Sequence, residues 1–145
     1  MADRTATATW NGTLTEGSGT VALTSSGIVH SAPISWHART ETSDGQTSPE
    51  ELLAGAHAAC FAMAFTNTLV KAGHQPEGVE VRATCTFAQR DGGFAVTTMQ
   101  LWTRATIAGI DEAAYQELAE TAKQNCPISR AIAGNVEVSL TAELA

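Results

Sequence analysis

The sequence predicts an α+β protein in which small antiparallel sheets surround one central, buried helix. Strand-like stretches come in groups of three, two and one along the chain, and a helical stretch separates each group from the next. The first helical stretch carries no charge from Leu52 to Phe65, and a helix that is apolar on all sides is buried on all sides. Strand groups that are separated by helices and joined largely by hairpins favour this class over a doubly wound sheet.

The composition indicates a single globular domain, residues 1–145, with its own hydrophobic core. Hydrophobic residues make up 43% of the chain and there are only four prolines, which argues against disorder. The net charge of −7 disfavours nucleic acid and anionic membranes as partners, because both attract basic surfaces. No N-terminal apolar run resembles a signal peptide, so we expect a cytoplasmic protein. In such a reducing compartment three cysteines do not form a disulfide framework.

The first third of the chain is expected to form three strands followed by a loop. Asn11-Gly12 is a strong turn signal and predicts a hairpin. Arg39 falls near the end of the third strand, and the polar residues 40–48 lead the chain to the long helix. The three stretches with the pattern of strands are residues 5–10, 20–24 and 34–39.

The long helix is predicted to begin after Ser48 and to end at Lys71. Ser48 is a good N-cap, Pro49 suits the first helical position, Glu51 completes a capping box, and Gly73 marks the stop. The apolar run is too short for a bilayer, which needs roughly 20 apolar residues. One small sheet can cover only one side of this helix. We therefore predict an obligate homodimer in which a second chain covers the other side.

The remaining residues are expected to form two strands, a second helix and a last strand. The apolar phase of the second of these strands changes near Thr97-Thr98, which predicts a β-bulge. Asp111 caps the second helix, which should end at Asn125 because the residue before Pro127 avoids the α region. Pro127 then starts a short turn. The predicted strands are residues 79–87, 94–107 and 136–144.

The three cysteines differ in their predicted surroundings. Cys85 lies on the apolar face of an alternating strand, where a thiol packs as a small hydrophobic side chain. Cys126 continues the apolar stripe of the second helix and precedes Pro127, at the N-cap of the turn that follows, where a thiolate is favoured. Cys60 lies midway along the long helix. The spacing alone does not distinguish a functional pair of Cys60 and Cys126 from two unrelated buried thiols.

His57 lies one turn before Cys60 and leaves three interpretations open. With Cys60 and Cys126 it would supply three metal ligands, but zinc sites bring paired ligands at short spacing and the sequence has no second pair. It is also placed to act as a base for Cys60, or to pack as a polar residue at a helix–helix contact. Glu50 and Arg39 have plain interpretations as well, as a favourable charge in the first helical turn and as a solvated residue at a strand edge.

Two motifs resemble one protein family. The run TSPEELLAGAHAACFAMAF, with AKQNCPIS downstream, closely resembles the OsmC/Ohr family of osmotically inducible and organic hydroperoxide resistance proteins, and the form HAACF is similar to the OsmC branch. The similarity extends over essentially the whole chain. The resemblance implies an OsmC-like fold, an intertwined homodimer and a thiol-dependent peroxidase that prefers organic hydroperoxides.

The resemblance also implies the roles of four residues. Cys60 is the peroxidatic nucleophile, Cys126 the resolving thiol, and Glu50 the glutamate of the Pro-Glu motif. Arg39 matches the arginine of the OsmC branch, and the first hairpin, where the Ohr branch places its arginine, contains none. An arginine held by a carboxylate suits this chemistry, because a cation near the sulfur stabilises the thiolate and polarises the peroxide.

The implied reaction needs no metal or organic cofactor. Cys60 thiolate attacks the peroxide, releases an alcohol and becomes a sulfenic acid, and Cys126 condenses with it to a disulfide. An external dithiol, in this family a lipoyl-type protein, then reduces the disulfide. Phe61, Met63 and Phe65 would line the site or pack in the core. A redox sensor, or a dimer that binds a small apolar ligand without efficient turnover, is the alternative.

The positions of Glu50 and Cys60 carry a geometric consequence. Ten residues of continuous helix separate them by about 15 Å, so Glu50 cannot touch Cys60 of its own chain. We hypothesise that each site takes Cys60 and Cys126 from one chain, and Glu50 with Arg39 from the other.

Overall fold

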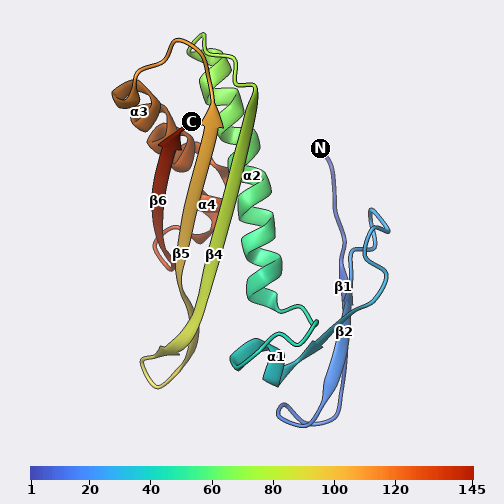
Figure 1. Cartoon of the computed structure of the whole chain (residues 1–145). Coiled ribbons are helices and arrows are strands. Elements are labelled where there is room, and N and C mark those ends of the chain that lie inside the picture. The colour runs from blue at the N-terminus through green and yellow to red at the C-terminus, as the bar shows by residue number, and fades with distance from the viewer. The chain divides into compact units, whose positions relative to one another are not determined.

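The computed structural model describes all of residues 1–145 as an α+β fold with two small sheets and four helices (Figure 1). The chain divides into two compact units, Met1–Leu52 and Leu53–Ala145. In chain order the elements are β1 (Thr7–Asn11), β2 (Ser18–Ala22), β3 (Ala32–Ser35), α1 (Trp36–Thr40), α2 (Pro49–Lys71), β4 (Gly78–Arg90), β5 (Gly93–Thr106), α3 (Glu112–Asn125), α4 (Pro127–Ile132) and β6 (Glu137–Leu144).

The first unit contains an antiparallel sheet in the order β1-β2-β3. Trp10 pairs with Gly19 across the first two strands, and a Cβ on Gly19 would collide with the carbonyl oxygen of Thr9 and lie 2.9 Å from the tryptophan ring. The glycine therefore leaves room for the indole to lie over the neighbouring strand. All five residues of β1 are exposed, and Val21 is the only buried hydrophobic residue of this unit.

The expectation that residues 34–39 form a strand is wrong for its second half. β3 ends at Ser35, whose hydroxyl accepts a hydrogen bond from the backbone N–H of Ala38 at 3.1 Å. This N-cap starts the short helix α1, which contains Arg39. Serine caps a helix because its side chain satisfies an N–H of the first turn, and this local bond outweighs a short alternating pattern.

α2 begins and ends where the sequence predicts. Ser48 Oγ accepts the backbone N–H of Glu51 at 3.1 Å, whereas the Glu51 carboxylate receives the hydroxyl of Thr47 at 2.6 Å. At the other end Gly73 has a φ of 88°, and His74 N–H returns to the carbonyl of Leu69 at 2.9 Å. The contacts of Ser48 and His74 satisfy backbone groups that a helix end leaves unpaired. The predicted capping box is only half formed, because the Glu51 carboxylate bonds to the side chain of Thr47.

The second unit contains a three-stranded sheet in the order β4-β5-β6. β4 and β5 form an antiparallel hairpin whose turn residues, Asp91 and Gly92, both have positive φ. Thr86 pairs with Thr98 and Phe87 with Val96, so the predicted bulge lies at Thr97. β6 departs from the expected antiparallel pairing and runs parallel to β5, because α3 and α4 carry the chain back to the opposite end of the sheet.

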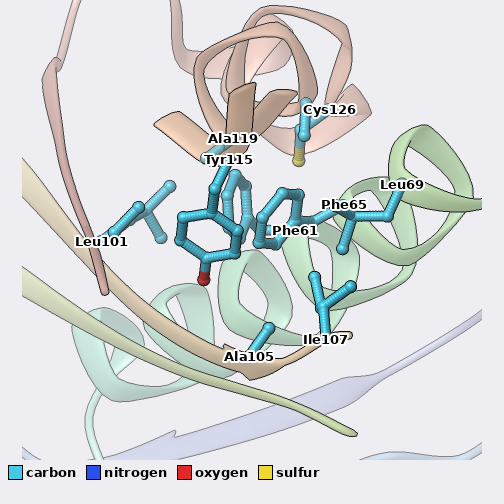
Figure 2. Packing of buried hydrophobic residues seen from close by; sticks show 11 residues of the cluster. Phe61, Phe65, Leu69, Leu101, Ala105, Ile107, Tyr115, Ala119 and Cys126 are labelled. Atoms are coloured by element: carbon cyan, nitrogen blue, oxygen red, sulfur yellow. The ribbon is translucent and has the colours of Figure 1, made fainter. Parts of the chain in front are cut away.

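The hydrophobic core of the second unit lies between this sheet and two helices. α2 and α3 pack on the same face of the sheet, and the rings of Phe65 and Tyr115 meet edge to face at 5.4 Å (Figure 2). Both are fully buried, and so is Phe61. The cluster also includes Leu69, Leu101, Ala105, Ile107, Ala119 and Ala122. Phe61 and Phe65 therefore pack in the core.

Within Leu53–Ala145, only one side of α2 is covered. The helix is long and apolar enough to cross a membrane by length and composition alone, a test that core helices also pass. Its buried face carries Phe61, Phe65 and Leu69, whereas Met63 is 68% and Val70 53% exposed. The helix therefore packs as a core helix on one side and leaves an apolar stripe on the other.

Candidate active site

The structure brings Cys60 and Cys126 together although they are 66 positions apart in the sequence. Their Sγ atoms are 3.4 Å apart, and both are thiols. Cys126 is fully buried and Cys60 is partly exposed. Because a disulfide bond is about 2.05 Å long, the sulfur atoms need to approach by only about 1.4 Å to form one.

The chain direction at Cys126 follows from the proline after it. Cys126 has extended backbone angles, φ −64° and ψ 122°, and it both ends α3 and serves as the N-cap of α4, as its position before Pro127 predicts. Its sulfur points into the core beside Phe61 and Phe65 (Figure 2). Because Cys126 follows the buried face of α3, its thiol lies against α2, next to Cys60.

Burial raises the pKa of the Cys60 thiol above its ordinary value. A backbone hydrogen bond from Ile128 in α4 lowers this pKa, whereas the neighbouring thiol of Cys126 raises it. No basic side chain is among the groups that shift the pKa. Within Leu53–Ala145, Cys60 is therefore mainly a thiol at neutral pH.

Arg39 and Glu50 form a second pair, inside the first unit. Arg39 Nε donates to both carboxylate oxygens of Glu50, at 3.1 and 3.2 Å, and its Nη2 donates to Oε1 at 2.8 Å. Glu50 is buried, whereas the arginine side chain is 31% exposed. The carboxylate thus fixes the guanidinium in one orientation and leaves part of it accessible. An apolar hollow of about 230 Å³, bordered by Trp10 and Trp36, adjoins Arg39.

The four predicted site residues thus form two pairs, one in each unit. Arg39 and Glu50 meet in Met1–Leu52, and Cys60 and Cys126 meet in Leu53–Ala145. Glu50 and Cys60 both belong to α2, which is a single helix from Pro49 to Lys71. Ten residues of that helix correspond to about 15 Å along its axis.

His57 bonds to Ser129 of α4, a contact that the sequence does not reveal. Its Nε2 lies 2.8 Å from Ser129 Oγ, both residues are buried, and Nδ1 has no hydrogen-bond partner. Burial lowers the pKa of His57, so its imidazole is neutral. Of the three interpretations, the polar residue at a helix–helix contact is the one that this geometry favours. The two partners are 72 positions apart in the sequence, which explains why spacing gives no signal for the bond.

Cys85 packs as the alternating strand predicts. It is a partly buried side chain of β4 that lies against the cluster of Ala54, Met99 and Val136. This environment is that of a small hydrophobic side chain.

A groove of about 730 Å³ lies between α2 and α3, and Cys60 is one of the residues that line it. Lys71, near the end of α2, is its one charged residue. The apolar part of the lining includes Met63, Ala64, Leu118 and Pro127, and the polar part is Asn67, Thr68, Thr121 and Asn125. We call it the α2–α3 groove. Its volume is in the range of small-molecule sites, so the partly exposed thiol of Cys60 faces a space that can hold an organic ligand.

Residues 42–141 match the family described as OsmC-like protein. This chain belongs to the OsmC-like family. It is 36% identical over 135 residues to the Peroxiredoxin OsmC of Escherichia coli (strain K12), a match that covers 93% of this chain and 92% of the relative. It is 35% identical over 96 residues to the Organic hydroperoxide resistance protein of Xanthomonas axonopodis pv. citri (strain 306), covering 66% of each.

Solved structures of organic hydroperoxide resistance proteins share the OsmC-like fold described above. The crystal structure of OhrB of Bacillus subtilis has a TM-score of 0.70 and 26% sequence identity, and the match covers 96% of this chain and 98% of that one. A protein of this group from Elizabethkingia anophelis has a TM-score of 0.73 and 29% identity, covering 97% and 96% of the two chains. The fold and family expected from the two motifs are confirmed.

Proposed function

We propose that this protein is a thiol-dependent peroxidase that reduces organic hydroperoxides to alcohols. The single observation that carries the proposal is the 3.4 Å contact between Cys60 and Cys126, beside a largely apolar groove that Cys60 lines. Relatives with the names peroxiredoxin and organic hydroperoxide resistance protein support the same activity.

In the proposed reaction the Cys60 thiolate attacks the distal peroxide oxygen. The O–O bond breaks, the alkoxide takes a proton to leave as an alcohol, and Cys60 becomes a sulfenic acid. The Cys126 thiol then attacks the sulfenic sulfur, water leaves, and a Cys60–Cys126 disulfide remains. An external dithiol, proposed to be of the lipoyl type, reduces this disulfide and returns both thiols. No step requires a metal or an organic cofactor.

We propose that the working unit is a homodimer with composite sites. A cation near the sulfur would favour the thiolate of Cys60 and so counteract the burial that raises its pKa. Glu50 holds Arg39 in one orientation with its guanidinium partly exposed. Continuous helix separates Glu50 from Cys60 of the same chain. The Arg39–Glu50 pair of a second protomer would supply the cation, and the exposed stripe of α2 would form part of the contact.

A mixed dimer tests the composite site. One chain carries Cys60→Ser and the other Arg39→Gln. In a composite arrangement one site has both defects and the other has none, so the mixed dimer should regain about half of the wild-type activity. Each parent homodimer should lose at least about 100-fold. Activity no higher than that of the parents would show that Arg39 serves Cys60 of its own chain.

The raised pKa of Cys60 also supports a second candidate, a redox-sensing or ligand-binding dimer with slow turnover. Steady-state peroxide consumption with excess dithiol separates the two. A peroxidase consumes many equivalents of cumene hydroperoxide, and more slowly hydrogen peroxide, whereas a sensor consumes about one and stops. Intact-mass analysis should show a trapped sulfenic acid in Cys126→Ser and no reaction in Cys60→Ser. If Cys60 stays reduced in wild type with both oxidants, the peroxidase proposal is wrong.

A further inference from the structure

α2 and the start of α4 contact each other at two points with matching spacing. His57 and Cys60 are three residues apart on α2, and residues at this spacing lie on the same face of a helix. Cys126 is the N-cap of α4 and Ser129 is three residues after it. The bond of 2.8 Å from His57 to Ser129 therefore lies one turn from the 3.4 Å contact of the two sulfur atoms.

α4 is too short to fix its own direction. It has six residues, whereas an isolated helix needs roughly 12 or more to be stable in water. The side chain of its N-cap, Cys126, makes no capping hydrogen bond, and Pro127 has no N–H. Ser129 is the only buried residue of this helix. The direction of α4 thus depends on the partner of that serine, which is His57.

The pair of His57 and Ser129 can fix this direction because it is polar and buried. His57 is 0% and Ser129 7% exposed. A hydrogen bond restricts both the distance and the direction between its partners, whereas an apolar contact tolerates sliding. Nδ1 of His57 has no partner, so the bond to Ser129 is the one hydrogen bond that orients the ring.

The residue before Ser129 contacts the reactive thiol directly. Ile128 carries the first backbone N–H of α4, because Pro127 has none, and this group bonds to the sulfur of Cys60. The bond lowers the pKa of the thiol, since a donor stabilises the charged form of its acceptor. A displacement of Ser129 would move this N–H and the neighbouring Cys126 together.

We infer that His57 and Ser129 are positioning residues, whose hydrogen bond fixes the start of α4 against α2 and so holds both the Ile128 N–H and the Cys126 thiol at Cys60. The inference deepens the proposed peroxidase function and rests on it only for the step that forms the disulfide. In that step a sulfur electron pair of Cys126 forms the S–S bond, the S–O bond of the sulfenic acid breaks, and the oxygen leaves as water. Neither positioning residue takes part in these bond changes.

Variants of the full-length protein remove the bond from either end. Ser129→Ala removes the hydroxyl and His57→Leu removes the imidazole. The double variant removes both and leaves no unpaired polar atom. His57→Gln is the conservative variant, because its amide can take the place of Nε2. Thr103→Val is the matched control: Thr103 is fully buried in the same unit, and its hydroxyl donates to the carbonyl of Glu80 at 2.9 Å.

The first measurement is the pH profile of alkylation of Cys60 by iodoacetamide. Mass spectrometry of the Cys60 peptide separates this thiol from the other two. Cys126 is the only titratable side chain among the groups that shift the pKa of Cys60. Agreement between Ser129→Ala and His57→Leu would exclude an effect of the His57 charge, because only the second variant removes the imidazole.

The profile should move to higher pH in both single variants and in the double variant. We expect the rate at pH 7 to fall about three- to tenfold, with the plateau at high pH nearly unchanged. The effect of the double variant should equal that of either single one, since all three remove the same bond. His57→Gln and Thr103→Val should keep the wild-type profile.

The second measurement is the lifetime of the sulfenic acid after one equivalent of cumene hydroperoxide, at a pH on the plateau. Rapid quenching and intact-mass analysis follow its conversion to the disulfide. The sulfenic acid should last at least about threefold longer in the variants that lack the bond, because the attacking sulfur of Cys126 is then less well placed. The control and His57→Gln should match wild type.

An unchanged pH profile in Ser129→Ala and in the double variant would overturn the inference. So would an equal loss of rate at every pH, plateau included, since that result indicates altered access to the thiol and not a less stable thiolate. An equal shift in Thr103→Val would overturn it as well, because general loosening of the core would explain the effect. If Ser129→Ala does not fold, the double variant and His57→Gln decide.

The peroxidase proposal can fail separately. If cumene hydroperoxide does not oxidise Cys60 while the alkylation profiles shift as expected, the proposed function is wrong and the positioning of Cys60 by His57 and Ser129 stands.

Discussion

The two units of the chain differ in how they are stabilised. The second unit, Leu53–Ala145, has a core of eleven buried residues. Most of them belong to α2, α3 and the sheet β4-β5-β6. Met1–Leu52 has a regular three-stranded sheet but only one buried hydrophobic residue, Val21, and Trp10, Leu14 and Ile28 are exposed. A three-stranded sheet needs a covered apolar face to be stable. The second unit is therefore self-sufficient, whereas the first depends on a surface that its own residues do not provide.

The same division separates the chemistry. The self-sufficient unit holds the two thiols, and the dependent unit holds the Arg39–Glu50 pair. If the proposed dimer covers the first unit, then assembly both folds that unit and supplies the cation that Cys60 lacks. The reactivity of Cys60 toward peroxides would then depend on dimer formation.

The largest expected effect is a cavity in the self-sufficient unit. Phe65→Ala removes a fully buried ring that contacts Phe61 and Tyr115. We expect it to lower the free energy of unfolding by about 3–5 kcal/mol, measured by urea denaturation under reducing conditions. The comparison is Val21→Ala in the first unit, which should lower the free energy of unfolding by only about 1–2 kcal/mol. Equal losses would contradict the proposed difference between the units.

The next effect tests whether the first unit depends on a second chain. Ala59→Glu places a charge on the exposed stripe of α2, where a small apolar residue stands. Light scattering should show a monomer, and backbone amides of β1 and β2 should exchange with solvent at least about 100-fold faster. Amides of β4 and β5 should keep their protection. Loss of protection in both sheets would mean that the two units unfold together.

The buried His57 predicts a pH dependence of stability in the self-sufficient unit. Its pKa in the folded protein is lowered from 6.5, so below about pH 6.5 the unfolded chain binds more protons than the native one. The free energy of unfolding should therefore fall as the pH is lowered from 6.5, by at most about 1.4 kcal/mol per pH unit. His57→Gln should have a flatter profile over the same range. Identical slopes in both proteins would refute this assignment.

The smallest expected effect is at Cys85. Cys85→Ala should lower the free energy of unfolding by about 1 kcal/mol, because it removes one partly buried atom. The rate of reaction with cumene hydroperoxide should stay within twofold of wild type. A large loss of peroxide reactivity would show that this thiol takes part in the redox cycle.

The sequence by itself determined the features that local interactions control. Capping at Ser48, the stop at Gly73, the bulge at Thr97 and the extended backbone of Cys126 before Pro127 all match the structure. Each depends on residues within a few positions of one another, where propensity and hydrogen-bonding geometry act directly. The identities of the candidate site residues came from motif resemblance, and their roles stay predictions.

Only the tertiary structure decided the contacts that join distant segments. The alternating pattern predicted that Arg39 lies in a strand. The N-cap at Ser35 starts α1 instead, and Arg39 in that helix bonds to Glu50. The parallel pairing of β6 also depends on where α3 and α4 pack. The thiol contact and the bond from His57 to Ser129 span 66 and 72 residues. Their distances depend on how helices pack around one core, which no local pattern encodes.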